Sequence, residues 1–301
     1  MIKLGIIGTS QGNGHPYSYS AIFNGYNKNE LKNNCPYELI REYLPKYHKN
    51  KNSIKNAKIT HIWTQSKKES YKISKVSRIK NVCNSLSELV QSVDAIILAR
   101  DDPQNYFKIL CSLIKSRKPL FVDKQFIHTK KNFTIFKKIL DKNQIFMYGS
   151  AMKYSNEVKK RKAFDAIFGK SKSTWLCYGN HLIDGIFEIV PKNIKYVSNK
   201  KKDNIENILI MTNENKKINL KFSKKFGLPI FFELKNKKNR NTKINFENYF
   251  FIYKKMLQKF INLINNEKKI KNHHDFFLSK VILAGEISKR KNGKKIYISS
   301  L

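Results

Sequence analysis

The sequence predicts an α/β protein in which a doubly wound parallel sheet is followed by an α+β domain with a mostly antiparallel, open sheet. Three observations predict this fold class. The chain opens with a short apolar strand that ends at glycines, and strand and helix patterns then alternate through the first 150 residues. Beyond residue 151, several strand patterns follow one another with short polar loops, as in antiparallel sheets. We therefore predict one domain over residues 1–150 and a second, for substrate binding or oligomerisation, over residues 151–301.

The first strand covers residues 2–8 (IKLGIIG) and is almost entirely apolar, which is typical of a buried parallel strand. A helix over Tyr17–Tyr26 follows, with Pro16 suited to its first position. Further strands are expected at Ile59–Trp63, Ala95–Ala99, Leu120–Asp123 and Ile145–Tyr148. The helices expected between them cover Pro36–Tyr43, Ser85–Val90, Asn105–Ser116 and Lys131–Leu140.

The second half begins with an expected basic helix at Asn156–Phe168, a strand at Thr174–Tyr178 and a helix that starts near His181. Four successive strands are then expected at Ile194–Val197, Ile208–Met211, Ile218–Phe222 and Ile230–Leu234. The chain closes with helices at Tyr249–Asn265 and Asp275–Arg290 and a strand at Lys295–Ser299. This last helix and strand are expected to pack back on the first domain.

The strongest compositional feature is the charge. The 301 residues include 60 Lys and Arg against 22 Asp and Glu, a formal net charge of +38. The basic residues are 53 lysines and only 7 arginines, and they are spread along the whole chain. Nucleic-acid sites depend on Arg for bidentate and stacking contacts. Lys, Asn and Ile have A/T-rich codons, so we favour compositional drift over nucleic-acid binding as the cause of the charge.

Other compositional features exclude several protein classes. An apolar content of 41% suffices for a sizeable core and excludes a disordered chain. No apolar run approaches the roughly 18–20 residues of a membrane-spanning helix, so no membrane association is expected. The cysteines lie far apart without a CxxC pair, which favours a cytoplasmic location and no metal site: Cys35, Cys83, Cys111 and Cys177.

The turn GTSQGNGHP, from Gly8 to Pro16, lies between the first strand and the first helix. Glycines at this junction let backbone amides and the helix N-terminus approach a pyrophosphate. Ser10 and Asn13 occupy two glycine positions of the G-x-G-x-x-G pattern, and Gly12 and Gly14 lie close by. The turn therefore indicates dinucleotide binding mainly through its location.

The end of the second strand does not decide between the cofactors NAD and NADP. Thr64, Gln65 and Ser66 stand where an acidic reader of the ribose 2′-hydroxyl is expected, and Lys67 and Lys68 follow. The lysines would favour a 2′-phosphate and hence NADP, but they equally suit a solvated helix start. The cofactor is therefore NAD or NADP.

Two further segments carry candidate chemistry. FVDKQF places Asp123 and Lys124 at the carboxyl end of a buried strand, where ligands of open α/β sheets bind. YGNHLIDG places His181 and Asp184 three residues apart on one helix face, so that the carboxylate could fix the tautomer of a histidine general base. The remaining histidines have no such setting, and no Ser-His-Asp or metal-ligand spacing is present.

Taken in order, these segments resemble the Gfo/Idh/MocA oxidoreductase family, which includes glucose–fructose oxidoreductase and inositol dehydrogenase. GIIGTSQGNG resembles the first-strand turn, and AIILARDDPQNYFKILCSLIKSRKPLFVDKQF resembles the strand, "TP" loop, helix and "GKxVxxEKP" run. YGNHLIDG resembles the "GxHxiD" element, and KNGKKIYIS resembles the final "nGkxV". The correspondence runs the length of the chain. The opening also resembles members associated with surface-polysaccharide sugar pathways.

The resemblance implies a nicotinamide-binding Rossmann domain and hydride transfer at a sugar or nucleotide-sugar carbinol or ketone. It implies that Lys124 touches the cofactor and the reacting hydroxyl, that His181 is the acid/base, and that Asp184 assists. It also implies a homo-oligomer, either a dimer or a tetramer. The cofactor-binding candidates are Gly8, Thr9, Ser10, Gly12, Asn13, Gly14, Thr64, Gln65, Arg100, Asp101, Pro103, Asp123 and Lys124.

Two residues depart from the family pattern. Gln125 replaces the proline of the "EKP" run, and Cys177 stands four residues before His181, where many members place a catalytic Asp. These departures support a first alternative, a non-enzymatic member that binds cofactor or sugar as a sensor or partner subunit. A second alternative, a polyanion-binding protein, rests on the net charge alone.

Overall fold

The computed structural model describes residues 1–48, 53–124, 127–140, 144–159, 164–227, 230–236, 241–266 and 273–301. Contacts between residues divide the chain into two compact units. The first unit holds the chain up to Lys124, most of strand β6 (Phe146–Gly149), and helix α9 (Tyr249–Asn265). The second holds most of helix α7 (Lys130–Leu140), residues 149–248 and the C-terminal elements.

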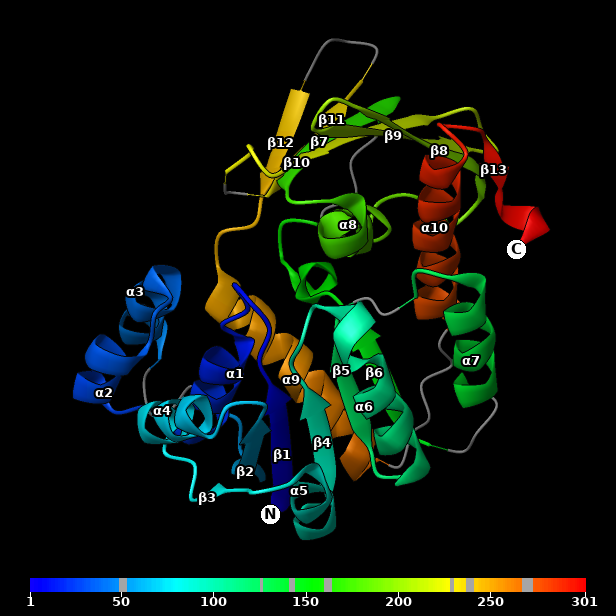
Figure 1. Cartoon of the computed structure of the whole chain (residues 1–301). Helices are drawn as coiled ribbons and strands as arrows, with labels where there is room; N and C mark the ends of the chain where they lie inside the picture. Colours follow the sequence, from blue (N-terminus) through cyan, green and yellow to red (C-terminus); the bar gives the residue numbers. More distant parts are fainter. Residues whose placement is uncertain are drawn as a thin grey trace. The chain divides into compact units, whose positions relative to one another are not determined.

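The first unit is built on a six-stranded sheet of order β3-β2-β1-β4-β5-β6 (Figure 1). Its other strands are β1 (Ile2–Gly8), β2 (Ala57–Thr64), β3 (Asn81–Val82), β4 (Ala95–Leu98) and β5 (Leu120–Asp123). The pairs β1–β2, β1–β4, β2–β3 and β4–β5 are all parallel. The strand order reverses between β1 and β4, and the carboxyl ends of the strands beside such a reversal form the usual ligand site of an open α/β sheet.

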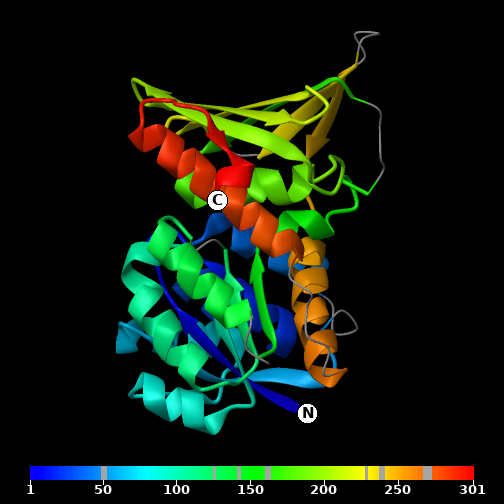
Figure 2. The ribbon, with the colours of Figure 1, turned by 90° about the vertical axis from the view of Figure 1, so that its right-hand side faces the viewer.

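Helices cover both faces of this sheet, with α5 and α6 on one side and α9 on the other (Figure 2). The helices of the unit besides α9 are α1 (His15–Asn24), α2 (Lys28–Asn34), α3 (Glu38–Tyr47), α4 (Lys67–Ser77), α5 (Leu86–Ser92) and α6 (Pro103–Lys115). Side chains of Asn27, Ser66 and Ser85 accept backbone N–H groups at the starts of α2, α4 and α5. Such caps satisfy donors that a helix leaves unpaired, and they fix where these helices begin.

Helix α9 comes late in the sequence yet belongs to the first unit. Its buried side chains include Phe250, Leu257 and Phe260. The ring of Phe260 lies 5.8 Å from that of Phe121 in β5. The first unit is therefore completed by a segment more than 100 residues beyond its last strand.

The second unit contains a seven-stranded sheet of order β12-β11-β7-β10-β9-β8-β13. Its strands are β7 (Ala166–Lys172), β8 (Ile194–Lys202), β9 (Ile205–Thr212), β10 (Lys217–Ser223), β11 (Phe231–Lys235), β12 (Asn241–Asn245) and β13 (Ile296–Tyr297). Only the β7–β10 pair is parallel among the described pairs of this sheet. Buried and less buried residues alternate along β9, as expected for a sheet with one covered face.

Helices α8 (Trp175–Ile186) and α10 (His273–Arg290) lie on the same face of this sheet (Figure 2). The fully buried Trp175 joins them, because its indole Nε1–H donates to the carbonyl of Ile282 over 3.0 Å. Strand β13 pairs with β8, and α10 packs against α8 and β8. The last helix and strand therefore complete the second unit, together with the short helices η2 (Ala151–Tyr154) and η3 (Ile298–Ser300).

Two element predictions in the second half are wrong. The segment expected to form a helix over 156–168 has a turn at 157–159 and enters β7 at Ala166, while residues 160–163 lie outside the described residues. Burial alternates along β7 with a period of two, as a strand requires. The strand expected at Thr174–Tyr178 is instead the start of α8, because the Thr174 hydroxyl caps the Cys177 N–H.

Candidate functional site

The turn between β1 and α1 requires glycine at three positions. Gly12 has a φ of +77°, a conformation that other residues adopt only with strain. A Cβ on Gly14 would lie 2.5 Å from Cδ1 of Ile40, and one on Gly8 would lie 2.5 Å from Cγ of Pro16. The turn is therefore packed closely against the first helices, and its glycines are needed for both conformation and space.

Asn13 holds this turn together and leaves one donor unpaired. Its Oδ1 accepts the backbone N–H of His15, the first residue of α1, over 2.9 Å. The residue is only 2% exposed, and its Nδ2 has no hydrogen-bond partner among the residues that the structure describes. Burying a donor without a partner costs free energy. The unpaired amide therefore indicates that a ligand acceptor binds at the N-terminus of α1.

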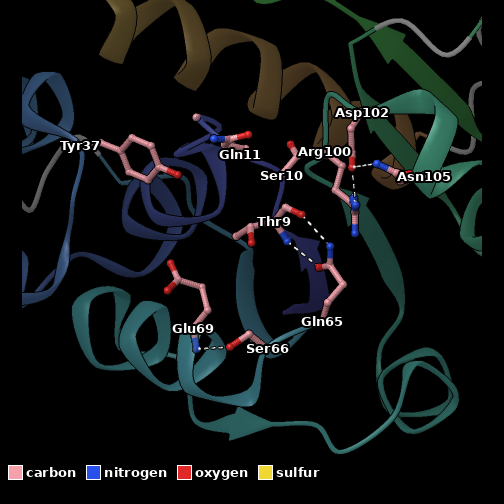
Figure 3. A pocket seen from close by; sticks show the side chains of 11 residues that line it. Thr9, Ser10, Gln11, Tyr37, Gln65, Ser66, Glu69, Arg100, Asp102 and Asn105 are labelled. Carbon is pink, nitrogen blue, oxygen red and sulfur yellow. Dashed lines mark hydrogen bonds and ion pairs between the residues drawn. The ribbon is translucent and has the colours of Figure 1, made fainter.

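A pocket of about 660 Å³ adjoins the turn (Figure 3). It is lined by Thr9, Ser10, Gln11, Gly12, Tyr37, Gln65, Ser66, Glu69, Arg100, Asp102 and Asn105. The Gln65 amide makes two hydrogen bonds to the backbone of Thr9, accepting its N–H over 2.9 Å and donating to its carbonyl over 2.8 Å. Gln65 therefore joins the end of β2 to the glycine turn, at the position where an acidic ribose reader was expected.

The side chains that line this pocket do not share the strong positive charge of the whole chain. Arg100 is paired with Asp102 at 2.5 Å, and Glu69 is a second acidic side chain in the lining. Lys67, just beyond β2, donates to Oδ1 of Asn84 over 2.7 Å and does not line the pocket. With one base and two acids in the lining, the pocket is not the basic cleft that a charge of +38 suggests.

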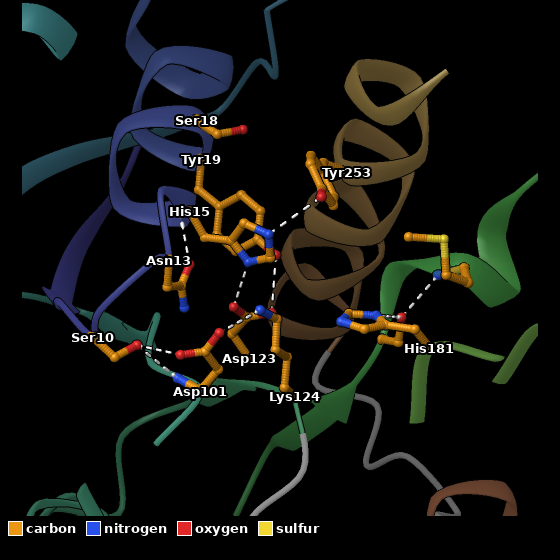
Figure 4. Close-up of polar contacts among 12 residues, drawn as sticks. Ser10, Asn13, His15, Ser18, Tyr19, Asp101, Asp123, Lys124, His181 and Tyr253 are labelled. Carbon is orange, nitrogen blue, oxygen red and sulfur yellow. Dashed lines mark hydrogen bonds and ion pairs between the residues drawn. The ribbon is translucent and has the colours of Figure 1, made fainter. Parts of the chain in front are cut away.

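Lys124 is buried at the carboxyl end of β5 and is only 5% exposed. Its ammonium pairs with Oδ2 of Asp101 at 2.9 Å, and the other oxygen of Asp101 accepts a hydrogen bond from the Ser10 hydroxyl (Figure 4). Burial raises the pKa of Asp101, but Lys124 and the Ser10 hydroxyl outweigh it and lower that pKa to about 2. The glycine turn, β4 and β5 are thus joined by one ionised carboxylate.

A second pair lies beside the first. Nδ1 of His15 is 2.5 Å from Oδ2 of the buried Asp123, and its Nε2 is 3.2 Å from the hydroxyl of Tyr253 in α9. Tyr19 donates to the other Asp123 oxygen over 3.0 Å. Burial raises the pKa of Asp123, but the charges of His15 and Lys124 outweigh it, so the net shift is downward. The prediction that no histidine other than His181 has a carboxylate placed to fix its tautomer is therefore wrong for His15.

The remaining cofactor candidates lie around the same edge of the sheet with different surroundings. Thr64 is buried inside the β2–α4 turn, where its hydroxyl donates to the carbonyl of Ser66, and it does not line the pocket. Pro103 stands at the start of α6. The Pro103 side chain and the whole of Gln125 lie outside the described residues.

His181 belongs to the second unit and lies in the second turn of α8. Its Nδ1 is 2.6 Å from the hydroxyl of Ser150, which follows β6 (Figure 4). Oδ2 of the fully buried Asp184 accepts the backbone N–H of Ser150 over 2.6 Å. His181 and Asp184 are thus both bound to Ser150, one through its side chain and the other through its backbone.

Several residues of these sites were missed in the sequence. His15 directly follows the glycine turn, and Ser150 directly follows a strand of the parallel sheet, so chain position offered a signal for both. Asp102 follows Asp101 in the same loop and Asn105 lies in the first turn of α6, so their positions offered a signal as well. Tyr37 carried none, because it precedes α3, in a segment inserted between α1 and β2.

Two other kinds of site are absent from the described residues. Among them, no group of three or more His, Cys, Asp or Glu side chains is arranged to hold a metal ion. Within the same ranges, no helix combines the length and apolar character needed to cross a membrane.

Comparison with known proteins identifies the fold. No family model and no curated protein matches the sequence, but solved structures match along its full length. Scyllo-inositol dehydrogenase from Lactobacillus casei, with NAD(H) and scyllo-inositol bound, has a TM-score of 0.70 at 13% identity, covering 99% of both chains. This chain has the fold of such dehydrogenases.

Two further structures agree with it. Myo-inositol 2-dehydrogenase from Lactobacillus plantarum has a TM-score of 0.71 at 11% identity and covers 98% of this chain and 99% of its own. UDP-N-acetylglucosamine 3-dehydrogenase from Acidithiobacillus ferrooxidans has a TM-score of 0.67 at 10% identity and covers 97% of both chains. The Rossmann-type parallel sheet and the mostly antiparallel second sheet predicted from the sequence are confirmed.

Proposed function

We propose that the protein is an NAD(P)-dependent oxidoreductase that acts on a carbinol or ketone of a sugar or nucleotide-sugar. The observation that carries the proposal is the link from Ser10 through Asp101 to Lys124. It connects the glycine turn of a dinucleotide-type sheet to a buried lysine at the carboxyl end of β5. The inositol and UDP-sugar dehydrogenases of the same fold support the substrate class.

The residues of the first unit fit a dinucleotide. The unpaired Nδ2 of Asn13 and the N-terminus of α1 offer donors to a pyrophosphate, and Gly12, with open space where a Cβ would stand, leaves room for its approach. Gln65 stands at the ribose position and carries no charge, which favours neither NAD nor NADP. A bound nicotinamide dinucleotide supplies the hydride acceptor or donor.

His181 and Lys124 have separate tasks in this proposal. His181 exchanges a proton with the substrate oxygen through its imidazole, which Ser150 holds at Nδ1. Lys124 contacts the reacting hydroxyl and polarises its oxygen, while Asp101 keeps the ammonium in place. Asp184 supports His181 by binding the backbone of Ser150. We further propose a role in surface-polysaccharide sugar metabolism and a cytoplasmic location, from the opening motif and the cysteine usage respectively.

Replacing the acid/base tests this assignment. His181→Ala should lower turnover by about 10²- to 10⁴-fold, the usual contribution of a general acid/base. NADH affinity, measured by fluorescence titration, should stay near that of the wild type. His61→Gln, in strand β2, is the matched histidine control and should leave both quantities unchanged. Undiminished turnover in His181→Ala would contradict the proposal.

The substrate is sought with inositols, aldoses and UDP-sugars, and nicotinamide absorbance is followed at 340 nm as the ordinary signal of NADH. Tight NADH binding without any absorbance change across this panel would favour the sensor or partner-subunit alternative that Cys177 suggests. Absence of both NADH and NADPH binding would reject the oxidoreductase proposal.

We also propose a homo-oligomer that pairs through the second sheet. Among the described residues, no helix covers the face of this sheet opposite α8 and α10. That face carries a depression of about 380 Å³ lined by Phe168, Gly169, Lys170, Asn219, Lys221, Phe231 and Glu233. Its mixture of aromatic and charged side chains suits a partly polar protein interface.

A further inference from the structure

Ser150 is held in place by contacts on both its backbone and its side chain. It is 1% exposed, its backbone N–H donates to Asp184, and its hydroxyl accepts the backbone N–H of Met152 over 3.2 Å. This last bond makes Ser150 the N-cap of η2. The position of the Ser150 oxygen is therefore set by η2 and Asp184 together, independently of His181.

The hydrogen bonds of this hydroxyl indicate where its proton lies. A serine hydroxyl has one proton to donate and two lone pairs that accept. One lone pair of Ser150 is used by Met152. Among the residues that the structure describes, Nδ1 of His181, at 2.6 Å, is the only acceptor within hydrogen-bond reach of the Ser150 proton. Since the side chain is buried from water, the proton points to Nδ1 when the imidazole is neutral.

We propose that Ser150 is a positioning residue that orients His181 and holds its neutral form with the proton on Nε2. A nitrogen that accepts a hydrogen bond cannot also carry a proton toward the same partner. When His181 is protonated, Nδ1–H donates instead to the second lone pair of Ser150. A hydroxyl supports both states, whereas a carboxylate, which cannot donate, would hold the proton on Nδ1.

This arrangement gives Nε2 two uses, and this part of the inference rests on the proposed function. In neutral His181, Nε2–H donates a hydrogen bond to a substrate oxygen. When a ketone is reduced, its oxygen gains a proton, and protonated His181 supplies it. The Nε2–H bond breaks, the O–H bond forms, and the imidazole is left at first with its remaining proton on Nδ1, donated to Ser150. This is the less stable of the two neutral forms, and proton exchange returns it to the Nε2–H form that Ser150 favours. Oxidation runs through the reverse steps and therefore starts from the less populated Nδ1–H form, in which Nε2 accepts the substrate proton.

The tautomer is measured directly, without substrate or cofactor. Full-length protein labelled with ¹⁵N-histidine is examined by long-range ¹H–¹⁵N NMR about two pH units above 6.5, the ordinary imidazole pKa, so that free imidazoles are neutral. His181→Gln identifies which of the seven histidines gives the His181 signals. The wild type should show a protonated Nε2 and an unprotonated Nδ1. A protonated Nδ1 in the wild type would overturn the proposal whether or not the protein is an oxidoreductase.

Substitutions then test whether Ser150 is the cause. Ser150→Ala should shift the His181 signals toward a mixture of tautomers, and Ser150→Thr, which keeps the hydroxyl, should restore the wild-type pattern. The matched control is Ser171→Ala in β7, because Ser171 is equally buried and its hydroxyl has no partner within the described ranges. Ser150→Cys, with its weak S–H donor, replaces Ser150→Ala if the latter does not fold. Unchanged His181 signals in Ser150→Ala and Ser150→Cys would also reject the proposal.

Enzyme kinetics distinguish a positioning role of Ser150 from a merely structural one, because the two roles affect kcat and KM differently. Once a substrate is known, Ser150→Ala should lower kcat by roughly 10- to 100-fold with little change in KM, because the bound substrate meets a misoriented imidazole. Ser150→Thr should recover most of this loss. An equal loss in Ser150→Thr would show that the hydroxyl is not responsible and would contradict the proposal.

Discussion

At the scale of single residues, Asp101 is the group whose ionisation links the glycine turn to the stability of the first unit. Its pKa falls from 3.8 to about 2 in the folded protein, and its side chain is 18% exposed. A lowered folded-state pKa contributes stability above the unfolded value, and this contribution is lost as the pH falls toward the folded value. The stabilisation from Asp101 should therefore be present above about pH 4 and disappear between about pH 4 and 2.

Asp101→Asn should remove this dependence. The variant should lose roughly 2 kcal/mol of unfolding free energy at neutral pH, and the difference from wild type should shrink below pH 4. Urea unfolding at a series of pH values measures it. Asp203→Asn, an exposed carboxylate between β8 and β9, is the control. A difference that stays constant down to about pH 2 would show that Asp101 acts by packing and not by charge.

The charged residues of the candidate site could be predicted from the sequence more readily than the neutral residues that bind them. Asp101, Lys124 and Ser10 were all expected near the cofactor, and the side chains of Lys124 and Ser10 both contact that of Asp101. Ser150 was missed because a serine after a strand is common, and only the backbone path that brings it to Nδ1 of His181 gives it a role. Such a contact depends on tertiary structure, which local residue patterns do not contain.

At the scale of elements, two glycines of the turn are required for different reasons, Gly14 for the space around it and Gly12 for its backbone conformation. Gly14→Ala would place a Cβ 2.5 Å from Cδ1 of Ile40 and 2.7 Å from Cδ2 of Tyr37, so these two side chains must shift. Gly12→Ala meets no atom within 4 Å and has only its φ of +77° to oppose it. We expect about 1–3 kcal/mol of destabilisation for Gly14→Ala and about 1 kcal/mol for Gly12→Ala.

Chemical denaturation measures both costs, and NADH titration shows whether they reach the cofactor. Because Tyr37 lines the pocket, Gly14→Ala should also weaken NADH binding more than Gly12→Ala does. Equal effects of the two substitutions on stability and binding would mean that the packing of α3 against the turn is not important.

Helices and strands with a clear period of apolar residues were predictable from the sequence. Those defined by a helix cap or by a partner strand were not. The long amphipathic helix at Tyr249–Asn265 was predicted with the bounds that α9 has. The start of α8 was mistaken for a strand, because Trp175 and its apolar neighbours suit either element and only the Thr174 cap distinguishes them. The two-residue strand β3 is too short to produce a periodic signal.

At the scale of the whole molecule, the proposed oligomer should depend on the open face of the second sheet. Phe168 is 38% exposed there, and the ammonium of Lys235 lies 4.4 Å from its ring. Phe168→Asp should convert the oligomer to monomers, as measured by sedimentation velocity. Tyr71→Asp, an equally conspicuous exposed aromatic on α4, is the control and should leave the assembly intact. An unchanged sedimentation coefficient in Phe168→Asp would reject this face as the interface.

The assignment of α9 to the first unit has a consequence for synthesis on the ribosome. The six-stranded sheet receives its last strand by residue 149, but the part of it around Phe121 in β5 stays uncovered until Phe260 and the rest of α9 have been made. The first unit therefore cannot fold to completion before the whole second sheet except β13 has been translated. During that interval the nascent chain exposes apolar surface, a state that favours aggregation and chaperone binding. A fragment that ends at residue 150 should remain in that state permanently.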